Sequence, residues 1–117
     1  ESRTCGSDQM EAVAPLNWDD RLDDAAELHT DDMNDNNFFS HNSPTHGTDP
    51  GMRINSANYI WSTYGENIYK GGTTVDAAMS AWLKSEPHCK NIMSAKFTEV
   101  GVSNKGTYWT QVFGKER

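Results

Sequence analysis

The feature that most constrains this chain is a strand-favouring segment with a carboxylate inside it. The segment from Tyr64 to Tyr69 is rich in residues that favour strands, and a pair of glycines ends it. Glu66 lies in the middle of this predicted strand. Two other segments, 38–44 and 82–93, each place a histidine between a hydrophobic residue and a turn-forming residue. We therefore predict that His41, Glu66 and His88 converge in one cleft.

The length and the aromatic content indicate one small domain that spans residues 1–117. A chain of 117 residues falls within the size range of a single domain. Apolar residues make up only 35% of it, but four Trp, four Tyr and four Phe are large enough to carry much of the burial. We expect the core to rest on clusters of aromatic side chains.

The net charge of −7 argues against nucleic acid as a partner, because phosphate binding requires clustered Lys and Arg. The apolar runs are also much shorter than the roughly 20 residues that span a bilayer. The chain opens without a signal peptide, and we expect a protein that is secreted or periplasmic after its signal peptide has been removed.

The cysteine pattern predicts one disulfide. Cys5 and Cys89 are the two cysteines, and they form no C-x-x-C pair of the kind found in zinc fingers and thioredoxin-like proteins. A bond between them would close a long loop, which is worth about 4 kcal/mol in the loop-entropy model. It would also imply an oxidising compartment. The alternative is a pair of unrelated buried thiols.

The order of predicted elements is that of an α+β protein, with helices layered on a small antiparallel sheet. Asn104-Lys105-Gly106 is typical of a hairpin turn, and Asp32–Asn37 matches a calcium loop too poorly to be one. We interpret the latter as a helix end with Asn in a left-handed conformation. The predicted elements are a short helix at 7–14 that Pro15 ends, a helix capped by Asn17 that reaches Met33, a short helix at 52–60, the strand around Glu66, a helix from Thr73 or Thr74 that Pro87 breaks, and strands at 98–103 and 107–113.

Two imidazoles and a carboxylate are enough to hold zinc or another divalent ion with positions left for water. The same groups can form a proton-transfer network without a metal. Spacing alone is a weak signal here, because there is no H-E-x-x-H helix, and a single histidine is more often a packed side chain than a ligand. His29 lies on an apolar helix stripe and favours that packed interpretation, and His46 lies in a polar loop. Glu86 precedes a proline at a predicted helix end, and its side chain could face either the cleft or solvent.

Four motifs occur in an order that resembles the CAP superfamily, which includes cysteine-rich secretory, antigen 5 and pathogenesis-related group 1 proteins. They are Asn37–His41, Gly65–Ile68, Trp82–Met93 and Glu99–Gly114, and together they resemble the compact bacterial branch. The resemblance implies a three-layer α-β-α sandwich, secretion, and a cleft with two histidines and two acidic residues.

In that resemblance His41 and His88 match the two histidines, and Glu66 matches the first acidic residue. The second acidic position is occupied by Ser85. Glu86 is one residue further along, and one residue turns a helical side chain by about 100°. A triad of His41, Glu66 and His88 is therefore the expected site, with Glu86 as a weaker candidate.

Three hypotheses on function follow. The first is a monomeric, secreted domain that is not an enzyme, in which the triad binds a small ligand, a lipid or an extracellular polymer, with a divalent metal such as zinc held by His41 and His88 and optionally by Glu66. The second is a metal-dependent or acid/base hydrolase that uses the same residues catalytically. The third is a structural or adhesion module in which they brace the sheet against its loops. The fold class alone does not decide among them.

Overall fold

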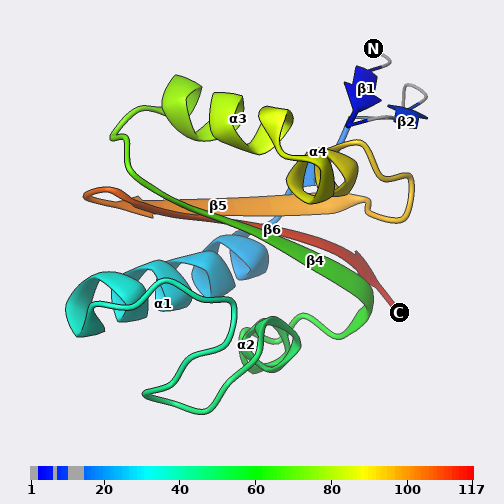
Figure 1. Cartoon of the computed structure of the whole chain (residues 1–117). Coiled ribbons are helices and arrows are strands. Elements are labelled where there is room, and N and C mark those ends of the chain that lie inside the picture. The colour runs from blue at the N-terminus through cyan, green and yellow to red at the C-terminus, as the bar shows by residue number, and fades with distance from the viewer. Residues whose placement is uncertain (1–2, 7, 11–14) are drawn as a thin grey trace.

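The structure is a computed structural model that describes residues 3–6, 8–10 and 15–117. The elements follow one another along the chain as Figure 1 shows. In chain order they are β1 (Arg3–Cys5), β2 (Asp8–Met10), β3 (Asn17–Trp18), α1 (Asp20–Asn36), α2 (Pro50–Ser56), β4 (Trp61–Lys70), α3 (Val75–Lys84), α4 (Glu86–Ile92), β5 (Glu99–Lys105) and β6 (Tyr108–Glu116).

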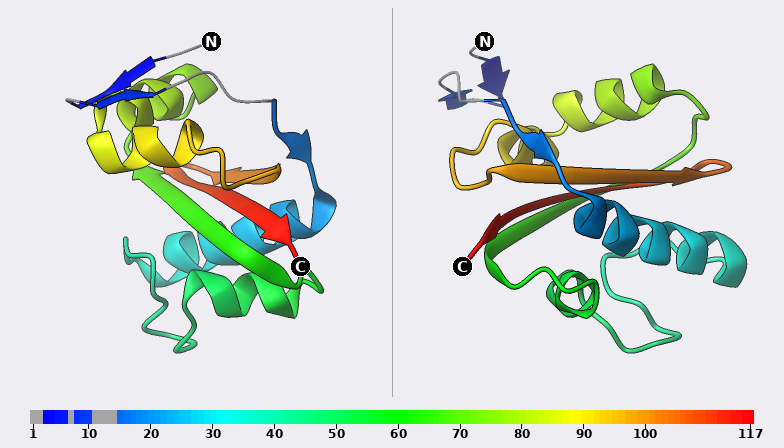
Figure 2. Two further views of the ribbon diagram at one scale, coloured as in Figure 1. Left: turned by 90° about the vertical axis from the view of Figure 1, so that its right-hand side faces the viewer. Right: turned by 180° about the vertical axis from the view of Figure 1, so that it is seen from behind.

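A four-stranded sheet separates the helices into two layers. Its strand order is β3-β5-β6-β4, with β4 and β5 antiparallel to β6 and with β3 parallel to β5. Helices α1 and α2 cover one face and α3 and α4 cover the other, as the views in Figure 2 also show. The predicted α-β-α sandwich is confirmed. β4 lies at the edge of the sheet, where the Glu66 side chain contacts Arg53 of α2 and the Glu66 backbone oxygen contacts Asn91 of α4.

The hairpin between β5 and β6 is confirmed and is tighter than predicted. Lys105 pairs with Tyr108, so only Gly106 and Thr107 form the turn. Gly106 has a φ of 60°, a left-handed conformation that glycine adopts without steric cost. A second glycine lets α1 approach the sheet closely. A Cβ on Gly101 would overlap the backbone of Leu22 and Asp23.

The prediction that α1 begins at Asn17 was wrong. Asn17 and Trp18 pair with Glu99 and Val100 of β5, so their backbone is committed to the sheet. The helix begins after Asp19, whose side chain accepts a hydrogen bond from the Arg21 backbone N–H. At its other end Asn37 is left-handed, with a φ of 55°, as predicted.

The helix predicted at 7–14 is also wrong where it can be compared. Asp8–Met10 forms a strand paired with Arg3–Cys5, while Ser7 and residues 11–14 lie outside the described part of the chain. The short helix predicted at 52–60 covers Pro50–Ser56 instead.

Thr74 caps α3, as predicted, by accepting a hydrogen bond from the Ala77 backbone N–H. The break expected at Pro87 falls earlier, because α3 ends at Lys84. Pro87 then lies in the first turn of α4, where the missing N–H costs nothing.

The predicted disulfide is present and fastens β1 to α4. Cys5 and Cys89 are bonded, both are fully buried, and they are 84 positions apart in the sequence. The bond therefore positions the helix that carries His88 against the amino-terminal strands.

Candidate functional site

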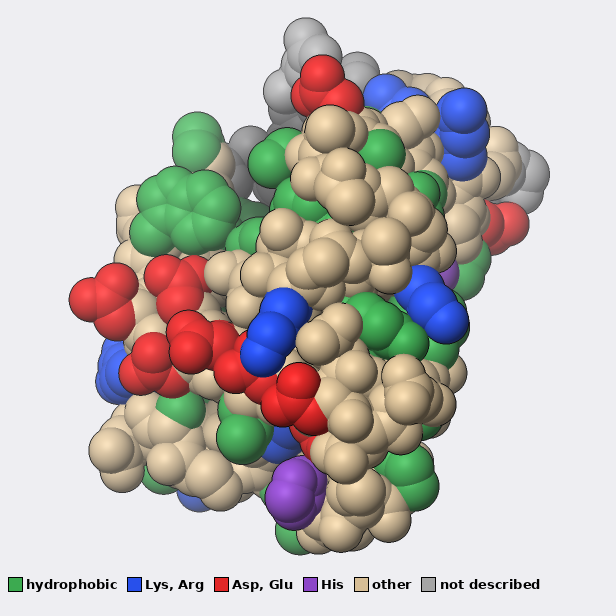
Figure 3. Space-filling view, turned by 90° about the vertical axis from the view of Figure 1, so that its left-hand side faces the viewer, with side chains coloured by type: hydrophobic (Ala, Val, Ile, Leu, Met, Phe, Trp, Pro, Cys, Tyr) green, Lys and Arg blue, Asp and Glu red, His purple; other side chains and the backbone are tan. Residues whose placement is uncertain are grey.

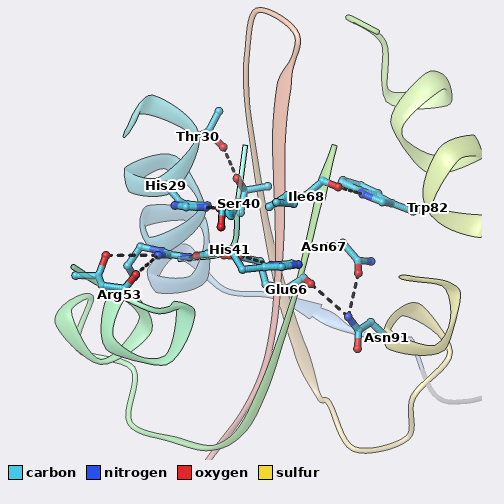
Figure 4. Close-up of polar contacts among 12 residues, drawn as sticks. His29, Thr30, Ser40, His41, Arg53, Glu66, Asn67, Ile68, Trp82 and Asn91 are labelled. Carbon is cyan, nitrogen blue, oxygen red and sulfur yellow. Dashed lines mark hydrogen bonds and ion pairs between the residues drawn. The ribbon is translucent and has the colours of Figure 1, made fainter. Parts of the chain in front are cut away.

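The centre of the candidate site is the carboxylate of Glu66, on edge strand β4. One oxygen, Oε1, accepts a hydrogen bond from His41 Nδ1 at 2.8 Å. The other, Oε2, accepts one from Arg53 Nη2 at 2.8 Å. Figure 4 shows His41 and Arg53 reaching Glu66 from the side of α1 and α2. Both oxygens of a nearly inaccessible carboxylate, with 2% of its side chain exposed, are thus engaged by protein donors.

Arg53 joins this carboxylate to the loop that carries His41. Its side chain is 2% exposed, and besides Glu66 it donates to the backbone oxygens of His41, at 2.8 Å, and Thr48, at 3.3 Å. The guanidinium presents several donors in a rigid plane, so one side chain can hold three acceptors at once. Sequence reasoning missed this residue. The available signal was the need for a cation beside a carboxylate in a strand.

The hydrogen bond to Glu66 determines which ring nitrogen of His41 carries the proton. An ionised carboxylate only accepts, so Nδ1 of His41 carries a proton and donates it. In the neutral ring, Nε2 then keeps its lone pair. The side chain is 49% exposed. Nδ1 is thus held by Glu66, and no described residue is hydrogen-bonded to Nε2.

His88 lies on α4, on the other side of β4, and its Nδ1 is hydrogen-bonded to Ser85 Oγ at 2.7 Å. Its pKa is lowered chiefly by burial and further by the positive charge that His41 carries when protonated. Within the described part of the chain, no hydrogen bond joins His88 to His41 or Glu66. The structure therefore brings His41 and Glu66 into direct contact, whereas His88 is hydrogen-bonded to Ser85 and is joined to β4 through Asn67.

A three-ligand metal site is not formed in this arrangement. Across the described residues, no group of three His, Cys, Asp or Glu side chains is placed to hold a metal ion. Glu66 fits poorly as a ligand, because both of its oxygens are engaged. The imidazoles remain suited to zinc by their chemistry. Metal binding by His41 and His88 stays a prediction.

An amide network supports the α4 side of the edge strand. Asn91 donates to Asn67 Oδ1 at 2.9 Å and to the Glu66 backbone oxygen at 3.3 Å. Asn67 donates to Gln111 Oε1 at 3.0 Å and to the His88 backbone oxygen at 3.2 Å. Figure 4 shows Asn91 on the opposite side of β4 from Arg53. These amides fix the position of α4, and hence of His88, against the strand.

The loop before α2 has its own anchor at Asp32. This carboxylate, 4% exposed, accepts hydrogen bonds from the side chains of Ser43, Thr45 and Asn36. Burial raises the pKa of Asp32, but the three hydrogen bonds outweigh burial and leave the pKa below its ordinary value. The segment that carries His41 is therefore held at Asp32 and again at Arg53.

The remaining candidates lie elsewhere. His29 is fully buried in α1, where Nε2 donates to the Ser40 backbone oxygen at 2.7 Å, so the packed interpretation is confirmed. His46 is largely exposed, as expected. Glu86 is 46% exposed and pairs with Lys90 at 2.9 Å, so its carboxylate is engaged along α4 rather than with His41.

The family emerges from comparison with known proteins. A sequence profile of the cysteine-rich secretory protein family, CAP, matches residues 3–113. The chain therefore belongs to the CAP family, as its motifs suggested. It is 40% identical over 107 residues to a Bacillus subtilis protein called YkwD, covering 90% of this chain and 41% of that protein.

Solved structures from bacteria share the fold. An extracellular protein containing an SCP domain from Bacillus anthracis aligns with a TM-score of 0.85 and 38% identity, covering 89% of this chain and 35% of the other. An outer surface protein from Borrelia burgdorferi aligns with a TM-score of 0.81 at 22% identity, covering 90% of this chain and 80% of the other. The chain thus spans less than half the length of YkwD and of the B. anthracis protein. None of the described helices is long and apolar enough to cross a membrane.

Proposed function

We propose that this chain is an exported binding domain in which His41 contacts the ligand and Glu66 orients His41. The observation behind the proposal is the double engagement of Glu66, by His41 on one oxygen and by Arg53 on the other. A carboxylate held in this way serves as an orienting group and is poorly placed to accept a proton from a substrate. A half-exposed imidazole with a free nitrogen is suited to binding.

The ligand is a small molecule, a lipid or an extracellular polymer that offers a donor or a metal ion to Nε2 of His41. A carboxylate behind a metal-binding imidazole fixes the ring and raises its basicity, which is the position of Glu66 here. His41 and His88 are the residues that would hold a divalent ion. Such an ion, when bound, would supply a Lewis acid between protein and ligand.

Calorimetric titration with zinc chloride near neutral pH tests the metal version, because the imidazoles are then largely neutral. We expect heat of binding in the parent protein, its loss in His41→Ala and a weaker signal in His88→Ala. His46→Ala is the control for an exposed histidine, since His46 is 61% exposed and lies 3.7 Å from Asp32 rather than against Glu66. Absence of zinc uptake, or uptake unchanged in His41→Ala, would remove the metal from the proposal.

A hydrolase is the second candidate, and one contact favours it. Ser85 Oγ lies 2.7 Å from His88 Nδ1, the arrangement of a hydroxyl beside a base. No carboxylate among the described residues is hydrogen-bonded to His88, so a third, orienting group is missing. Turnover on a library of peptides and cell-wall fragments that disappears in both Ser85→Ala and Glu66→Gln would favour the hydrolase over the binding domain.

A further inference from the structure

His29 carries a buried nitrogen without a hydrogen-bond partner, and no other described residue has an inaccessible side-chain polar atom in that state. The whole residue is buried in α1. Its Nε2 donates to the backbone oxygen of Ser40 at 2.7 Å, while Nδ1 has no partner. A carbonyl oxygen only accepts, so the proton of the neutral ring lies on Nε2 and Nδ1 holds a lone pair.

Two contacts that His29 makes outside α1 come from the segment that carries His41. Ser40 accepts the hydrogen bond, and the ring of Phe38 lies 5.8 Å from the imidazole, centroid to centroid. Figure 4 shows His29 beside Ser40, next to the contact between His41 and Glu66. Residues 39–42 are exposed and belong to no helix or strand, so this segment can open locally while α1 stays packed against the sheet.

A proton on Nδ1 would place a donor and a charge where the closed segment provides for neither. Burial is the largest influence on the pKa of His29 and lowers it. The charge of Arg53 also lowers this pKa, while Glu66, Asp32 and the hydrogen bond to Ser40 raise it without reversing the result. The closed arrangement therefore favours the neutral ring, and an open segment, in which water reaches the ring, favours the protonated one.

The charges around the ring come from three elements. Among the described residues, those that are both charged and buried are Asp32 of α1, Arg53 of α2 and Glu66 of β4, and all three act on His29. Strand β6 meets this part of α1 with Thr110, which is uncharged and is bonded to Thr30 at 2.7 Å.

Exposed charges add only a weaker field. Figure 3 shows acidic side chains gathered in a row on one face of the molecule. On α1, Asp31 and Asp35 pair with Lys105 of β5 at 3.8 and 3.6 Å, and all three side chains are largely exposed. Salt screens such charges, so their influence on a buried ring can be suppressed by raising the ionic strength.

Protonation of the two histidines on the loop before α2 has the opposite effect. His41 donates to Glu66 at 2.8 Å, and His46 lies 3.7 Å from Asp32. A positive charge on either ring strengthens its contact with the carboxylate. On this side of the sheet, acidification therefore tightens the loop through His41 and His46 and loosens it through His29.

We propose that His29 is a pH-sensitive switch for the candidate site: when its buried ring takes up a proton, segment 38–42 separates from α1 and His41 loses its fixed orientation. This inference rests on the proposed function, because it describes the regulation of the same site. In the open segment the ring has an ordinary pKa of about 6.5. The closed state is therefore fully favoured above that pH, and its advantage is lost as the pH falls below it.

Hydrogen exchange of the Phe38 backbone amide, measured by NMR, tests this switch. In the closed segment this N–H donates to the Met33 oxygen at 3.3 Å. Between pH 7 and pH 5, in about 0.3 M sodium chloride to screen surface charges, its protection factor should fall by about five- to thirtyfold, since each pH unit below 6.5 weakens closure at most tenfold. The Thr98 amide, which donates to Gly114 at the start of β5, should keep its protection.

Two variants separate His29 from the other titrating groups. His29→Gln retains an N–H donor for Ser40 but does not titrate, so the protection of the Phe38 amide should change less than about twofold over the same pH range. His46→Gln removes an exposed histidine of the same loop and should behave like the parent. Should His29→Gln fail to fold, ring NMR of the parent decides, because the His29 titration should coincide with the loss of protection.

Three results would overturn the switch. They are constant protection of the Phe38 amide in the parent between pH 7 and pH 5, an equal loss in His29→Gln, and a loss at Thr98 as large as that at Phe38, which would indicate global unfolding. Amide exchange needs no ligand, so its failure is distinct from failure of the zinc titration. If the amide responds as expected but zinc uptake is unchanged in His41→Ala, the switch stands and the metal is removed from the proposed function.

Discussion

The two faces of the sheet differ in how their buried groups are arranged. On the α1 and α2 side, buried polar groups are joined in pairs: Arg53 with Glu66, and Thr30 with Thr110 at 2.7 Å. On the α3 and α4 side, aliphatic and aromatic side chains surround a cavity of about 480 Å³, and the amides of Asn67, Gln111 and Asn91 form a hydrogen-bonded network. Directional hydrogen bonds favour a single arrangement, whereas an apolar cavity accommodates different shapes.

This difference assigns different tasks to the two faces. The polar face holds His41 in one orientation through Glu66, and the loop around it through Arg53 and Asp32. The α3 and α4 face positions His88 through the amides of Asn67 and Asn91 and leaves a cavity beside α3. We expect substitutions on the polar face to reduce stability sharply and those around the cavity to be better tolerated.

The largest expected effect is at Arg53. Replacing it by Met leaves Glu66 buried without its cation, which typically costs about 3–5 kcal/mol. Urea denaturation measures the loss. Arg21→Met is the control, since Arg21 is 36% exposed and its partners Asp19 and Glu116 are 11% and 43% exposed, so its removal should change stability less. Equal losses of stability in both variants would contradict the distinction between the buried Arg53–Glu66 pair and the more exposed ion pairs of Arg21.

Loss of the disulfide comes next, and it affects the other face. The double variant Cys5→Ala/Cys89→Ala should lose about 2–5 kcal/mol of stability, because the unfolded chain gains freedom. Thermal denaturation with and without a reductant measures this. The reductant should lower the melting temperature of the parent to that of the double variant and leave the double variant unchanged. If the melting temperature of the parent did not change once its disulfide had been fully reduced, the disulfide would not stabilise the fold.

A smaller effect is expected from one buried hydroxyl pair. Thr30→Val removes the donor to Thr110 and should cost about 1–3 kcal/mol, because the partner hydroxyl is left unsatisfied. The double variant Thr30→Val/Thr110→Val should be nearly as stable as the parent, since no polar group is then stranded. Urea denaturation of the single and double variants gives the coupling free energy between the two hydroxyl groups. Additive losses would show that the pair does not act as a unit.

The smallest effect is a pH dependence from Asp32. Its pKa is lower in the folded protein, so the unfolded chain binds more protons on acidification. The stabilisation is complete above the unfolded value of about 3.9 and is lost as the pH falls from there through the folded pKa. Melting temperatures of the parent and Asp32→Asn between neutral and strongly acidic pH test this. The gap between them should narrow below that value, and a constant gap would contradict the prediction.

The sequence predicted the parts of the fold that depend on local chemistry. The hairpin at Gly106 and the cap at Thr74 come from turn and capping preferences, and the structure confirms both. The start of α1 was mispredicted because the pairing of Asn17 with Glu99 depends on a strand far along the chain. The helix predicted at 7–14 failed at Asp8–Met10 for a similar reason, since pairing with β1 outweighs helical spacing.

The site was predictable only where the family resemblance marked it. The contact of His41 with Glu66 follows from the motifs, and the geometry agrees. The role of Arg53 did not follow, because a single arginine on a short helix has no pattern of its own. The hydrogen bond between Asn67 and Gln111 depends on cross-strand pairing, which no local pattern indicates.

The orientation of His41 is the central claim, and long-range ¹H–¹⁵N NMR of its ring at a pH where it is neutral tests it most directly. We predict a proton on Nδ1 and a lone pair on Nε2, because Glu66 accepts from Nδ1. A ring protonated on Nε2 instead would mean that Glu66 does not hold His41, and the proposed binding site would lose its basis.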